Sequence, residues 1–395
     1  MEIAGLVEGS GEEYNSIEER DVAAKGPKRL LMTTDTVGWV WRYTINLAGA
    51  LAHRGWQVRL ATFGPPPDAA QRAEVDSLPG VMLVAGEFPL DWAGADRDAM
   101  QAAAAELADM VRREACDLAH LHAPLLAAAA DWTVPLVGLI HACGGSELAA
   151  GTSPQLVKDS EWHWTMTRQG LEACDRLVAP TLASAAMVSV DRPVKVIYNG
   201  SSPHLPVGPE RKAPFVFTAG RLWDETRNVA LLDAVAGKLD VPFLAAGEQI
   251  GPGGQKLKAR NLRLLGSISM DEINAHLSQR PVFVSAAQVE PFGLGVLEAA
   301  ESGCALVLSD IPAFRELWGG AATFVDPHDE AGFLSAIEML IQDADLRHKV
   351  GAAACCRAMD YSLRAMTDAM VSQYEGVLEE EHSAAQKVTS SAIRH

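Results

Sequence analysis

The sequence predicts an α/β protein made of two Rossmann-like, doubly wound domains that face each other across a cleft. From residue 29 onward, short apolar runs alternate with longer amphipathic stretches, which is the pattern of parallel βαβ units. The alternation pauses once, at residues 198–214, and then begins again. A chain of 395 residues is also longer than an ordinary single domain, so two domains are expected.

The first half of the chain opens with a βαβ unit. Residues 29–34 (RLLMTT) are expected to form a buried strand, residues 41–54 a helix that stops at Gly55, and residues 56–62 the next strand. Parallel strands connected in this way cross over with a right hand. Further strands are expected at 81–84, 118–121, 136–140, 177–179 and 194–197, and helices most clearly at 97–114 and 161–173.

The second half repeats the alternation and then ends in helices. Its strands are expected at 215–219, 242–246, 262–265, 282–284, 305–308 and 323–325, and its helices at 227–239, 271–278, 294–302, 330–342, 345–358 and 363–378. The pause contains Asn199-Gly200 and several prolines, which is typical of a connection between domains. We therefore divide the chain into a disordered tail (1–27), an N-terminal Rossmann-like domain (28–198), a linker (199–214), a C-terminal Rossmann-like domain (215–360), a C-terminal helix (361–380) and a frayed tail (381–395).

Charge and cysteine content limit the partners and the compartment. The net charge is −18 and no domain-sized basic stretch relieves it, so no nucleic-acid binding is expected and an anionic membrane is a poor partner. A small basic patch would still allow peripheral membrane contact, which nothing in the sequence indicates. Residues 121–141, the most apolar stretch, are interrupted by Asp131 and Pro135, so no transmembrane segment is expected. The six cysteines form no C-x-x-C pair and the N-terminus has no apolar signal core, which favours a cytoplasmic location.

The most informative motif is Glu290-Pro-Phe-Gly-Leu-Gly-Val-Leu-Glu298, which follows a predicted strand and opens a predicted helix. The amino end of a helix offers N–H groups and a positive dipole end, which suit a phosphate. Gly293 lets the backbone approach a ligand closely. Glu298, about one turn into the helix, can accept two vicinal hydroxyls such as those of a ribose, and Glu290 can reach a neighbouring sugar. Two isolated acids near a helix start are also explained by the helix dipole, so the surrounding motifs decide.

The surrounding motifs resemble glycosyltransferase family 4, whose members are retaining enzymes of the GT-B fold. The resemblance covers most of the chain and is sharpest over residues 215–326. In the second half it rests on Thr218-Ala-Gly-Arg-Leu222, Leu265-Gly-Ser-Ile268, the motif from Glu290 to Glu298, Ser309-Asp-Ile-Pro-Ala-Phe-Arg-Glu316 and Val325-Asp-Pro327. In the first half it is looser and rests on Asp35-Thr-Val-Gly38, Leu51-Ala-His-Arg-Gly55 and Val196-Ile-Tyr-Asn-Gly200. It implies a donor side in the C-terminal domain, an acceptor side in the N-terminal domain, and a helix at 361–380 that crosses back to the first domain.

Four residues match positions that act in catalysis in this family. Arg221 matches the Arg that neutralises the donor diphosphate, and Arg227 falls on or beside the position of a Lys with the same task. Arg227 keeps the charge but presents a planar fork instead of a compact ammonium group. Glu290 is expected to orient the sugar or stabilise the cationic ring, and a nucleophilic role stays open. His141, at the end of a predicted strand, matches a histidine that contacts the donor sugar, with a purely structural histidine as the alternative.

Donor binding is expected from two loops, the motif helix and a glycine in the first domain. The loop at 266–268 would meet the base through its backbone, and Glu298 would hold the ribose. Gly38 is followed by Trp39, where family members usually carry a second glycine, so Trp39 is expected to narrow the site, stack on a sugar or obstruct the usual pose. The predicted donor-binding residues are Gly38, Gly266, Ser267, Ile268, Pro291, Phe292, Gly293, Leu294 and Glu298.

No metal and no cofactor are expected beside the nucleotide-diphosphate sugar, which is a co-substrate. The D-x-D strings at 96–98 and 343–345 precede predicted helices and are interpreted as caps. His120 and His122 share one face of a predicted strand without an evident ligand partner, and are interpreted as cleft or core residues. A G-x-G-x-x-G fingerprint is missing after the first strand, which argues against NAD or FAD.

The sequence therefore predicts a retaining glycosyltransferase that moves a sugar from a nucleotide-diphosphate-sugar donor to a small-molecule or glycan acceptor. Two alternatives stay open. One is a catalytically altered protein of the same fold that binds a nucleotide sugar for regulation or partner docking, motivated by Trp39, Arg227 and residues 142–147. The other is a GT-B enzyme of non-glycosidic chemistry. The oligomeric state is also open.

Overall fold

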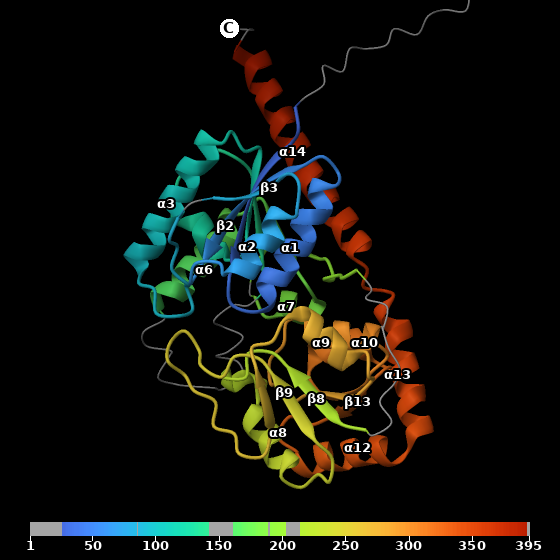
Figure 1. Ribbon diagram of the computed structural model, residues 1–395. Coiled ribbons are helices and arrows are strands. Elements are labelled where there is room, and N and C mark those ends of the chain that lie inside the picture. The colour runs from blue at the N-terminus through green and yellow to red at the C-terminus, as the bar shows by residue number, and fades with distance from the viewer. Residues whose placement is uncertain (1–25, 85, 142–160, 189, 203–213, 393–395) are drawn as a thin grey trace, which may run out of the picture.

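The computed structural model describes residues 26–84, 86–141, 161–188, 190–202 and 214–392. Within these ranges the chain forms two α/β domains stacked one above the other, with the last helix running back along the first domain (Figure 1). The predicted tail at 1–27 falls almost wholly outside the described residues, as do most of the predicted linker at 199–214 and the loop at 142–147.

The N-terminal domain is built on a parallel sheet. Over the described residues this sheet has seven strands in the order β3-β2-β1-β4-β5-β6-β7. The order changes direction beside β1, which pairs with both β2 and β4, and such a reversal opens a crevice at the carboxyl ends of the strands. The strands are β1 (Arg29–Asp35), β2 (Gln57–Phe63), β3 (Val81–Leu83), β4 (Leu118–Leu121), β5 (Leu136–Leu139), β6 (Arg176–Ala179) and β7 (Val194–Val196).

The C-terminal domain repeats this plan. In the part of the chain that the structure describes, its parallel sheet has six strands in the order β10-β9-β8-β11-β12-β13, and the reversal lies between β8 and β11. Two parallel sheets covered by helices confirm the predicted fold class (Figure 1). The strands are β8 (Val216–Ala219), β9 (Phe243–Ala246), β10 (Arg263–Gly266), β11 (Val282–Ser285), β12 (Ala305–Ser309) and β13 (Thr323–Val325).

Helices follow the strands in sequence and cover both sheets. Those of the N-terminal domain are α1 (Trp39–Ala52), α2 (Ala69–Asp76), α3 (Arg97–Arg113), the 3-10 turn η1 (Pro124–Ala128), α6 (Glu161–Ala173) and α7 (Leu182–Ala186). Those of the C-terminal domain and the chain end are η2 (Glu225–Arg227), α8 (Val229–Ala236), α9 (Met270–Leu277), α10 (Leu294–Glu301), α11 (Pro312–Trp318), α12 (Glu330–Gln342), α13 (Ala344–Ala358) and α14 (Leu363–Ala392).

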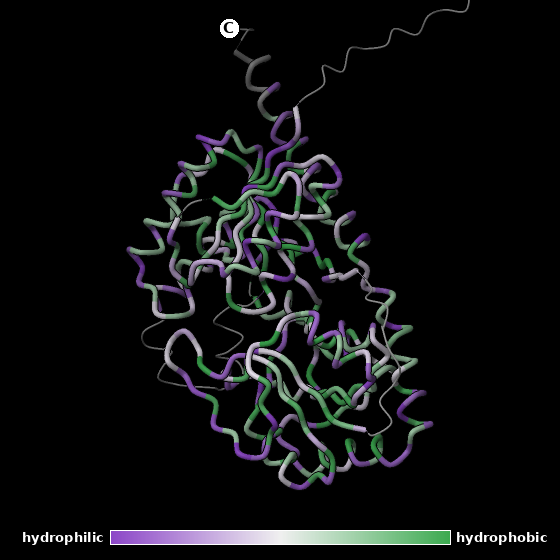
Figure 2. The backbone as a smooth tube through the Cα atoms, viewed as in Figure 1, coloured by the Kyte–Doolittle hydropathy of each residue, from purple (hydrophilic) through white to green (hydrophobic). Residues whose placement is uncertain are grey.

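The strands are apolar because both faces of each sheet are covered. Every residue of β4, β5, β9 and β12 is buried, as expected for central strands of a doubly wound sheet. Figure 2 shows hydrophobic segments inside both domains and hydrophilic turns along the outer helices. The helix faces that touch the sheets supply the rest of each core, such as Leu47 and Leu51 of α1 and Phe333 and Ile337 of α12.

Helix α14 crosses from the C-terminal domain to the N-terminal domain and packs against α1 (Figure 1). Its Tyr374 is fully buried, and the phenol oxygen lies 2.5 Å from Nδ1 of His120 on β4. The helix continues to Ala392, so residues 381–392 are helical and not the frayed tail that the sequence predicted. An ion pair between Arg176 and Glu380 ties the preceding turn of α14 to the N-terminal domain, and the helix continues from there.

Candidate functional site

The carboxyl ends of strands from both domains meet between the domains. β1 ends at Asp35 and leads into the start of α1, β5 leads into His141, β8 leads into Arg221, and β11 leads into the loop that carries Glu290. Two cavities lie here, one of about 30 Å³ and one of about 120 Å³. Residues of both domains line each of them, and Arg221, Arg227 and Glu290 are among the lining residues of both.

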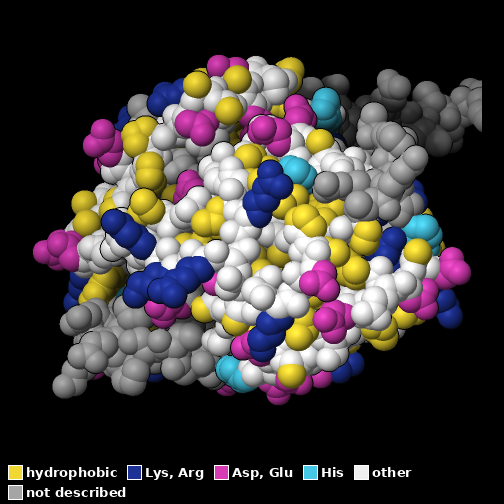
Figure 3. Space-filling model, turned by 60° about the horizontal axis from the view of Figure 1, so that its bottom comes forward, with side chains coloured by type: hydrophobic (Ala, Val, Ile, Leu, Met, Phe, Trp, Pro, Cys, Tyr) yellow, Lys and Arg dark blue, Asp and Glu magenta, His cyan; other side chains and the backbone are white. Residues whose placement is uncertain are grey.

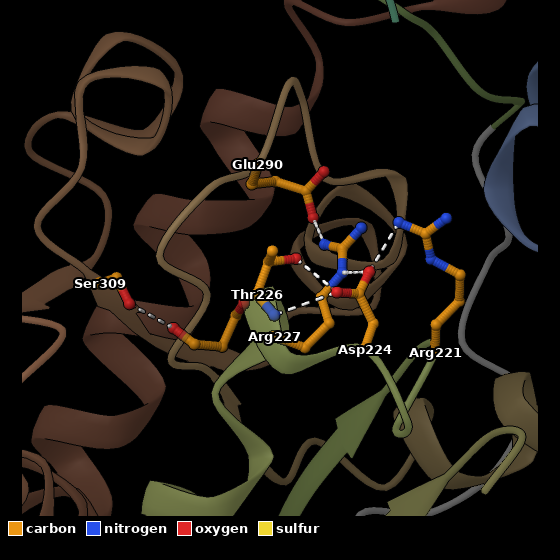
Figure 4. A network of polar contacts seen from close by, with 7 residues as sticks. Arg221, Asp224, Thr226, Arg227, Glu290 and Ser309 are labelled. Carbon is orange, nitrogen blue, oxygen red and sulfur yellow. Dashed lines mark hydrogen bonds and ion pairs between the residues drawn. The ribbon is translucent and has the colours of Figure 1, made fainter. Parts of the chain in front are cut away.

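Arg221 and Arg227 lie side by side at one wall of the cleft (Figure 4). Asp224 lies between them: its Oδ2 is 2.8 Å from Nη2 of Arg221 and 3.8 Å from Nε of Arg227. Arg227 also forms an ion pair with Glu290. Burial by itself would raise the pKa of Asp224, but the two guanidinium groups and hydrogen bonds from Thr226 hold that pKa below its ordinary value. Two cations and two carboxylates therefore form one network, and both cations face the cavities.

Helix α10 directs its amino end at the same place. Gly293 is its N-cap, with φ of +86°, and no side chain caps the helix. This φ lies in the left-handed region, where glycine is favoured, and a Cβ here would also come within 3.3 Å of Cγ of Glu290 and 3.1 Å of Phe314. The uncapped amino end of α10 and the two guanidinium groups thus converge on the small cavity, which suits an anion.

The loop before α10 is anchored by the N-terminal domain. The carbonyl oxygen of Pro291 accepts hydrogen bonds from Thr181 Oγ1 at 2.9 Å and Ser184 Oγ at 3.1 Å. Phe292 and Leu294 are buried, and Phe292 packs edge-on against Tyr361. The side chains of Phe292 and Leu294 therefore belong to the core, and their backbone is the part that can meet a ligand.

Glu298 and the loop at 266–268 lie away from the two cavities. Glu298 is buried on the second turn of α10, and its Oε1 lies 3.8 Å from Nε of Arg42 on α1, while its Oε2 has no hydrogen-bond partner. Burial raises the pKa of Glu298 to about 8, against the opposing effect of Arg42. Gly266, Ser267 and Ile268 follow β10 and line neither cavity. The structure therefore gathers Arg221, Arg227 and Glu290 around the cavities. The residues expected to hold the nucleoside, Glu298 and 266–268, lie outside them.

On the N-terminal side, Asp35 and His141 line the larger cavity, and burial shifts the pKa values of both towards the neutral form. His141 has its Nε2 buried without a hydrogen-bond partner, and burial lowers the pKa of His141 to about 3. Tyr43 packs edge-on against it, with ring centroids 4.5 Å apart. Asp35 is 3% exposed and accepts a hydrogen bond from the Val37 N–H at 3.0 Å. Burial raises the pKa of Asp35 to about 7, although Arg221 opposes this rise.

Gly38 adopts φ of +94° as the N-cap of α1, and a Cβ there would lie 3.4 Å from Cδ of Arg221. Because Gly38 has no side chain, the N-terminal domain can come close to Arg221, the residue of the C-terminal domain predicted to bind the diphosphate. Trp39 follows it and lines both cavities. Of the three outcomes expected for Trp39, the structure shows a side chain that narrows the cleft.

The sequence analysis assigned no role to the side chains of Asp35, Asp224 and Arg42. Asp224 lies three residues from Arg221 and from Arg227, which is a readable signal for an ion-pair network. Asp35 is the last residue of the buried strand β1, which places it at the carboxyl edge of the sheet. Arg42 lies one turn after Trp39 on α1, but its contact with Glu298 depends on how the domains face each other, which no local pattern shows.

Comparison with known proteins gives the family. The model of "Glycosyltransferase Family 4" matches residues 38–204, and that of "Glycosyl transferases group 1" matches residues 207–355. The chain belongs to glycosyltransferase family 4 and has the GT-B fold. It is 26% identical over 369 residues to a phosphatidyl-myo-inositol mannosyltransferase of Mycobacterium leprae, covering 87% of this chain and 94% of the relative. It is 25% identical over 410 residues to a D-inositol 3-phosphate glycosyltransferase of Nocardia farcinica, covering 89% and 87%.

Solved structures agree with the fold of this glycosyltransferase. Sucrose-phosphate synthase from Thermosynechococcus elongatus superposes with a TM-score of 0.72 at 17% identity, covering 89% of this chain and 100% of the other. Anabaena HepE, solved in complex with UDP and glucose, superposes with a TM-score of 0.67 at 16% identity, covering 88% and 100%. At these identities the likeness establishes the GT-B architecture.

Other polar residues of this glycosyltransferase serve its framework. Asp96 and Asp343 accept hydrogen bonds from the N–H groups of Ala99 and Leu346, so both D-x-D strings contain caps, as predicted. His122 contacts Thr33 Oγ1 through its backbone N–H and its Nδ1, and burial lowers the pKa of His120 to about 3 and that of His122 to about 4. In the described ranges, no three potential metal ligands come together.

The charges on one face of the molecule are mixed. On the face shown in Figure 3, acidic and basic side chains are interspersed, and neither sign gathers into a continuous patch. Among the helices of the described residues, none has the combination of length and apolarity that a membrane crossing requires.

Proposed function

We propose that this glycosyltransferase transfers a sugar, with retention of anomeric configuration, from a nucleotide-diphosphate sugar to a small-molecule or glycan acceptor. One observation carries the proposal: Arg221, Arg227, Glu290 and the amino end of α10 line the same cavity between the domains. The names of the relatives support a sugar donor, and the complexes of Anabaena HepE with UDP and with UDP-glucose support a nucleoside diphosphate.

The chemistry follows from the charges. Cleavage of the anomeric C–O bond leaves negative charge on the diphosphate, and Arg221, Arg227 and the N–H groups of α10 would stabilise that charge. Glu290, already paired with Arg227, would exchange part of that contact for the sugar and stabilise its cationic ring. His141, neutral because of its lowered pKa, would offer Nε2 as a hydrogen-bonding group to the sugar.

The remaining assignments concern the nucleoside and the conditions of the reaction. We propose that Glu298 receives the ribose hydroxyls and that the backbone of residues 266–268 meets the base.

Guanidinium groups supply the positive charge in this scheme, so it uses no metal, and EDTA should leave the turnover unchanged. The five cysteines within the described ranges are free thiols, which supports the proposed reducing, cytoplasmic location.

The test is a screen of nucleotide sugars with the purified chain. Release of nucleoside diphosphate is followed with and without polyol, sugar-phosphate and glycan acceptors, and the product is analysed by mass spectrometry. NMR of its anomeric centre reports the stereochemistry. We expect one donor to give an acceptor-dependent product with the anomeric configuration of the donor. An inverted product would refute retention, and tight donor binding without transfer to any acceptor would refute the enzymatic role.

A second candidate is a protein that binds nucleotide sugars without turnover. The observation in its favour is Trp39, which lies in the cleft where family members usually carry a glycine. The same screen separates the candidates, because a binding protein gives a rise in unfolding temperature with its nucleotide but no release of diphosphate. A ligand at about a hundredfold above its Kd adds about 2.7 kcal/mol of stability, which is readily measured.

A further inference from the structure

The first turn of α1 extends two side chains into the donor half of the cleft. Trp39 and Arg42 are three residues apart on this helix and therefore lie on one of its faces. Both point across the domain interface at α10, although they belong to the N-terminal domain. The donor side predicted from the C-terminal domain is thus partly occupied by residues of the other domain.

The Trp39 ring lies against the first turn of α10. A Cβ built on Gly295 would meet Cζ2 of this ring at 3.0 Å and Cη2 at 3.3 Å, so only a glycine fits beneath the ring without a shift. On its other side, Nε1 of Trp39 lies 3.8 Å from the equivalent position on Gly220. The indole therefore bridges the amino end of α10 and the loop that carries Arg221, which are the groups proposed to hold the diphosphate.

The space left beside the indole is too small for a diphosphate. The cavity at the Gly295 turn of α10, which Trp39, Arg221 and Arg227 line, has a volume of about 30 Å³, and the same three residues also line the adjoining cavity of about 120 Å³. One water needs roughly 10–15 Å³, so the small cavity accepts about two or three waters. A diphosphate can enter the small cavity and reach the Gly295 turn of α10 only after the indole moves.

Trp39 contacts the first turn of α10, and Arg42, one turn later on α1, contacts the second turn of α10 at Glu298. Its Nη1 lies 2.9 Å from Glu74 on α2, and its Nε lies 3.8 Å from Oε1 of Glu298. The other oxygen of Glu74 accepts a hydrogen bond from Trp41 Nε1 at 2.9 Å, which fixes the carboxylate that holds Arg42. Arg42 is the cation beside a buried carboxylate that has one oxygen without a partner, so a ribose at Glu298 would compete with this contact.

We propose that Trp39 and Arg42 form a plug in the donor half-site, so that nucleotide binds only when the first turn of α1 withdraws from α10. The inference rests on the proposed function, because it assigns the plugged space to the donor diphosphate and ribose. Its consequence is thermodynamic: the measured affinity equals the intrinsic affinity multiplied by the fraction of molecules with the plug withdrawn. Shortening the plug therefore tightens nucleotide binding, which is the opposite of what loss of a donor contact produces.

The test is calorimetric titration of UDP, and in parallel GDP, into the full chain and three variants. We expect Trp39→Ala to tighten binding about tenfold and Arg42→Gln about threefold, since each removes part of the contact that the nucleotide must displace. Trp164→Ala is the matched control, because Trp164 is an exposed tryptophan on α6 that lines neither cavity. Unchanged or weaker binding by Trp39→Ala, with a thermal unfolding transition like that of the parent, overturns the plug.

A second measurement does not depend on the alanine variant being well folded. Acrylamide quenching of tryptophan fluorescence is compared between the parent chain and Trp39→Phe, with and without UDP. We expect UDP to increase quenching in the parent and to leave it unchanged in Trp39→Phe, because only the parent has an indole to expel. Equal responses in the two proteins contradict the plug.

The two proposals fail in different ways. If the parent and Trp39→Ala bind UDP or GDP equally and the parent transfers sugar, the proposed function stands and the plug is wrong. If neither nucleotide binds to any of the proteins, the proposed donor site is wrong and the plug falls with it.

Discussion

The two walls of the cleft have opposite electrostatic characters. On the C-terminal side, Arg221 and Arg227 are permanent cations, each beside a carboxylate. On the N-terminal side, Asp35 is buried and His141 is half-buried, and desolvation shifts the pKa values of both towards the neutral form. Both walls are carboxyl ends of parallel sheets, so the fold places the residues and the local surroundings decide their charge. A charged wall suits a leaving diphosphate, and a neutral wall suits hydroxyl groups.

The largest effect is expected on the charged wall. Arg227→Ala should lower kcat/KM by about 10²–10³, because one of the groups that stabilise the leaving charge is removed and Glu290 loses its ion-pair partner. Arg227→Lys should retain more activity, since it keeps the charge and loses the planar fork. Steady-state kinetics with the donor found in the screen measures both.

The matched control for this variant is Arg263→Ala. Arg263 is an exposed cation at the start of β10, in the same domain and outside both cavities. A loss of activity in this control equal to that of Arg227→Ala would show that net charge matters and the cleft position does not.

A smaller effect is expected from the ribose carboxylate. Glu298→Ala should weaken UDP binding about tenfold and leave kcat at saturating donor largely intact, since the ribose does not react. Glu290→Ala should do the reverse and lower kcat with little change in UDP affinity. Titration calorimetry and kinetics on the two variants separate these roles, with Glu172→Ala on the exposed face of α6 as the control. Near-normal turnover in both variants would contradict the site assignment.

The same two walls differ in how far the sequence predicts them. The predicted strand 118–121 and the predicted helix 330–342 have the same bounds in the structure. A short apolar run marks the strand, and the N-cap Asp329 marks the start of the helix. Helix α8 begins two residues later than predicted, because Asn228 has φ of +55° and cannot continue the turn that ends at Arg227. The residues of the charged wall could be identified from the sequence, because all of them belong to one domain. Arg221 and Arg227 follow strand β8, and Glu290 opens the motif that ends at Glu298.

The neutral wall and the plug were less predictable because they depend on the fold as a whole. Asp35 looks like an ordinary loop acid in the sequence, and its raised pKa comes from burial by elements distant along the chain. Trp39 could be recognised as a departure, but whether it stacks or obstructs depends on its distance from Gly295 in the other domain. The contact between Arg42 and Glu298 could not be predicted for the same reason, because the two residues belong to different domains.

The smallest effect, and the sharpest test of the neutral wall, concerns stability and pH. Burial raises the pKa of Asp35 from 3.8 to about 7 in the folded chain. The folded state thus holds this proton until about pH 7 and the unfolded state loses it near pH 4. The contribution of Asp35 to stability is full below pH 4 and is lost as the pH rises to 7, at up to about 1.4 kcal/mol per pH unit.

Asp35→Asn should remove the contribution of Asp35 to the slope of the unfolding free energy between pH 4 and pH 7. The amide oxygen can still accept the Val37 N–H, and no charge forms at high pH. We expect the variant to match the parent in urea unfolding at pH 4 and to exceed it at pH 8. Other buried groups titrate equally in both proteins, so the difference between their stability curves isolates Asp35. Asp240→Asn, at an exposed acid in the turn after α8, should leave the curve unchanged. Parallel curves for the parent and Asp35→Asn would mean that this carboxyl is ionised in the folded protein, and that both walls of the cleft are charged.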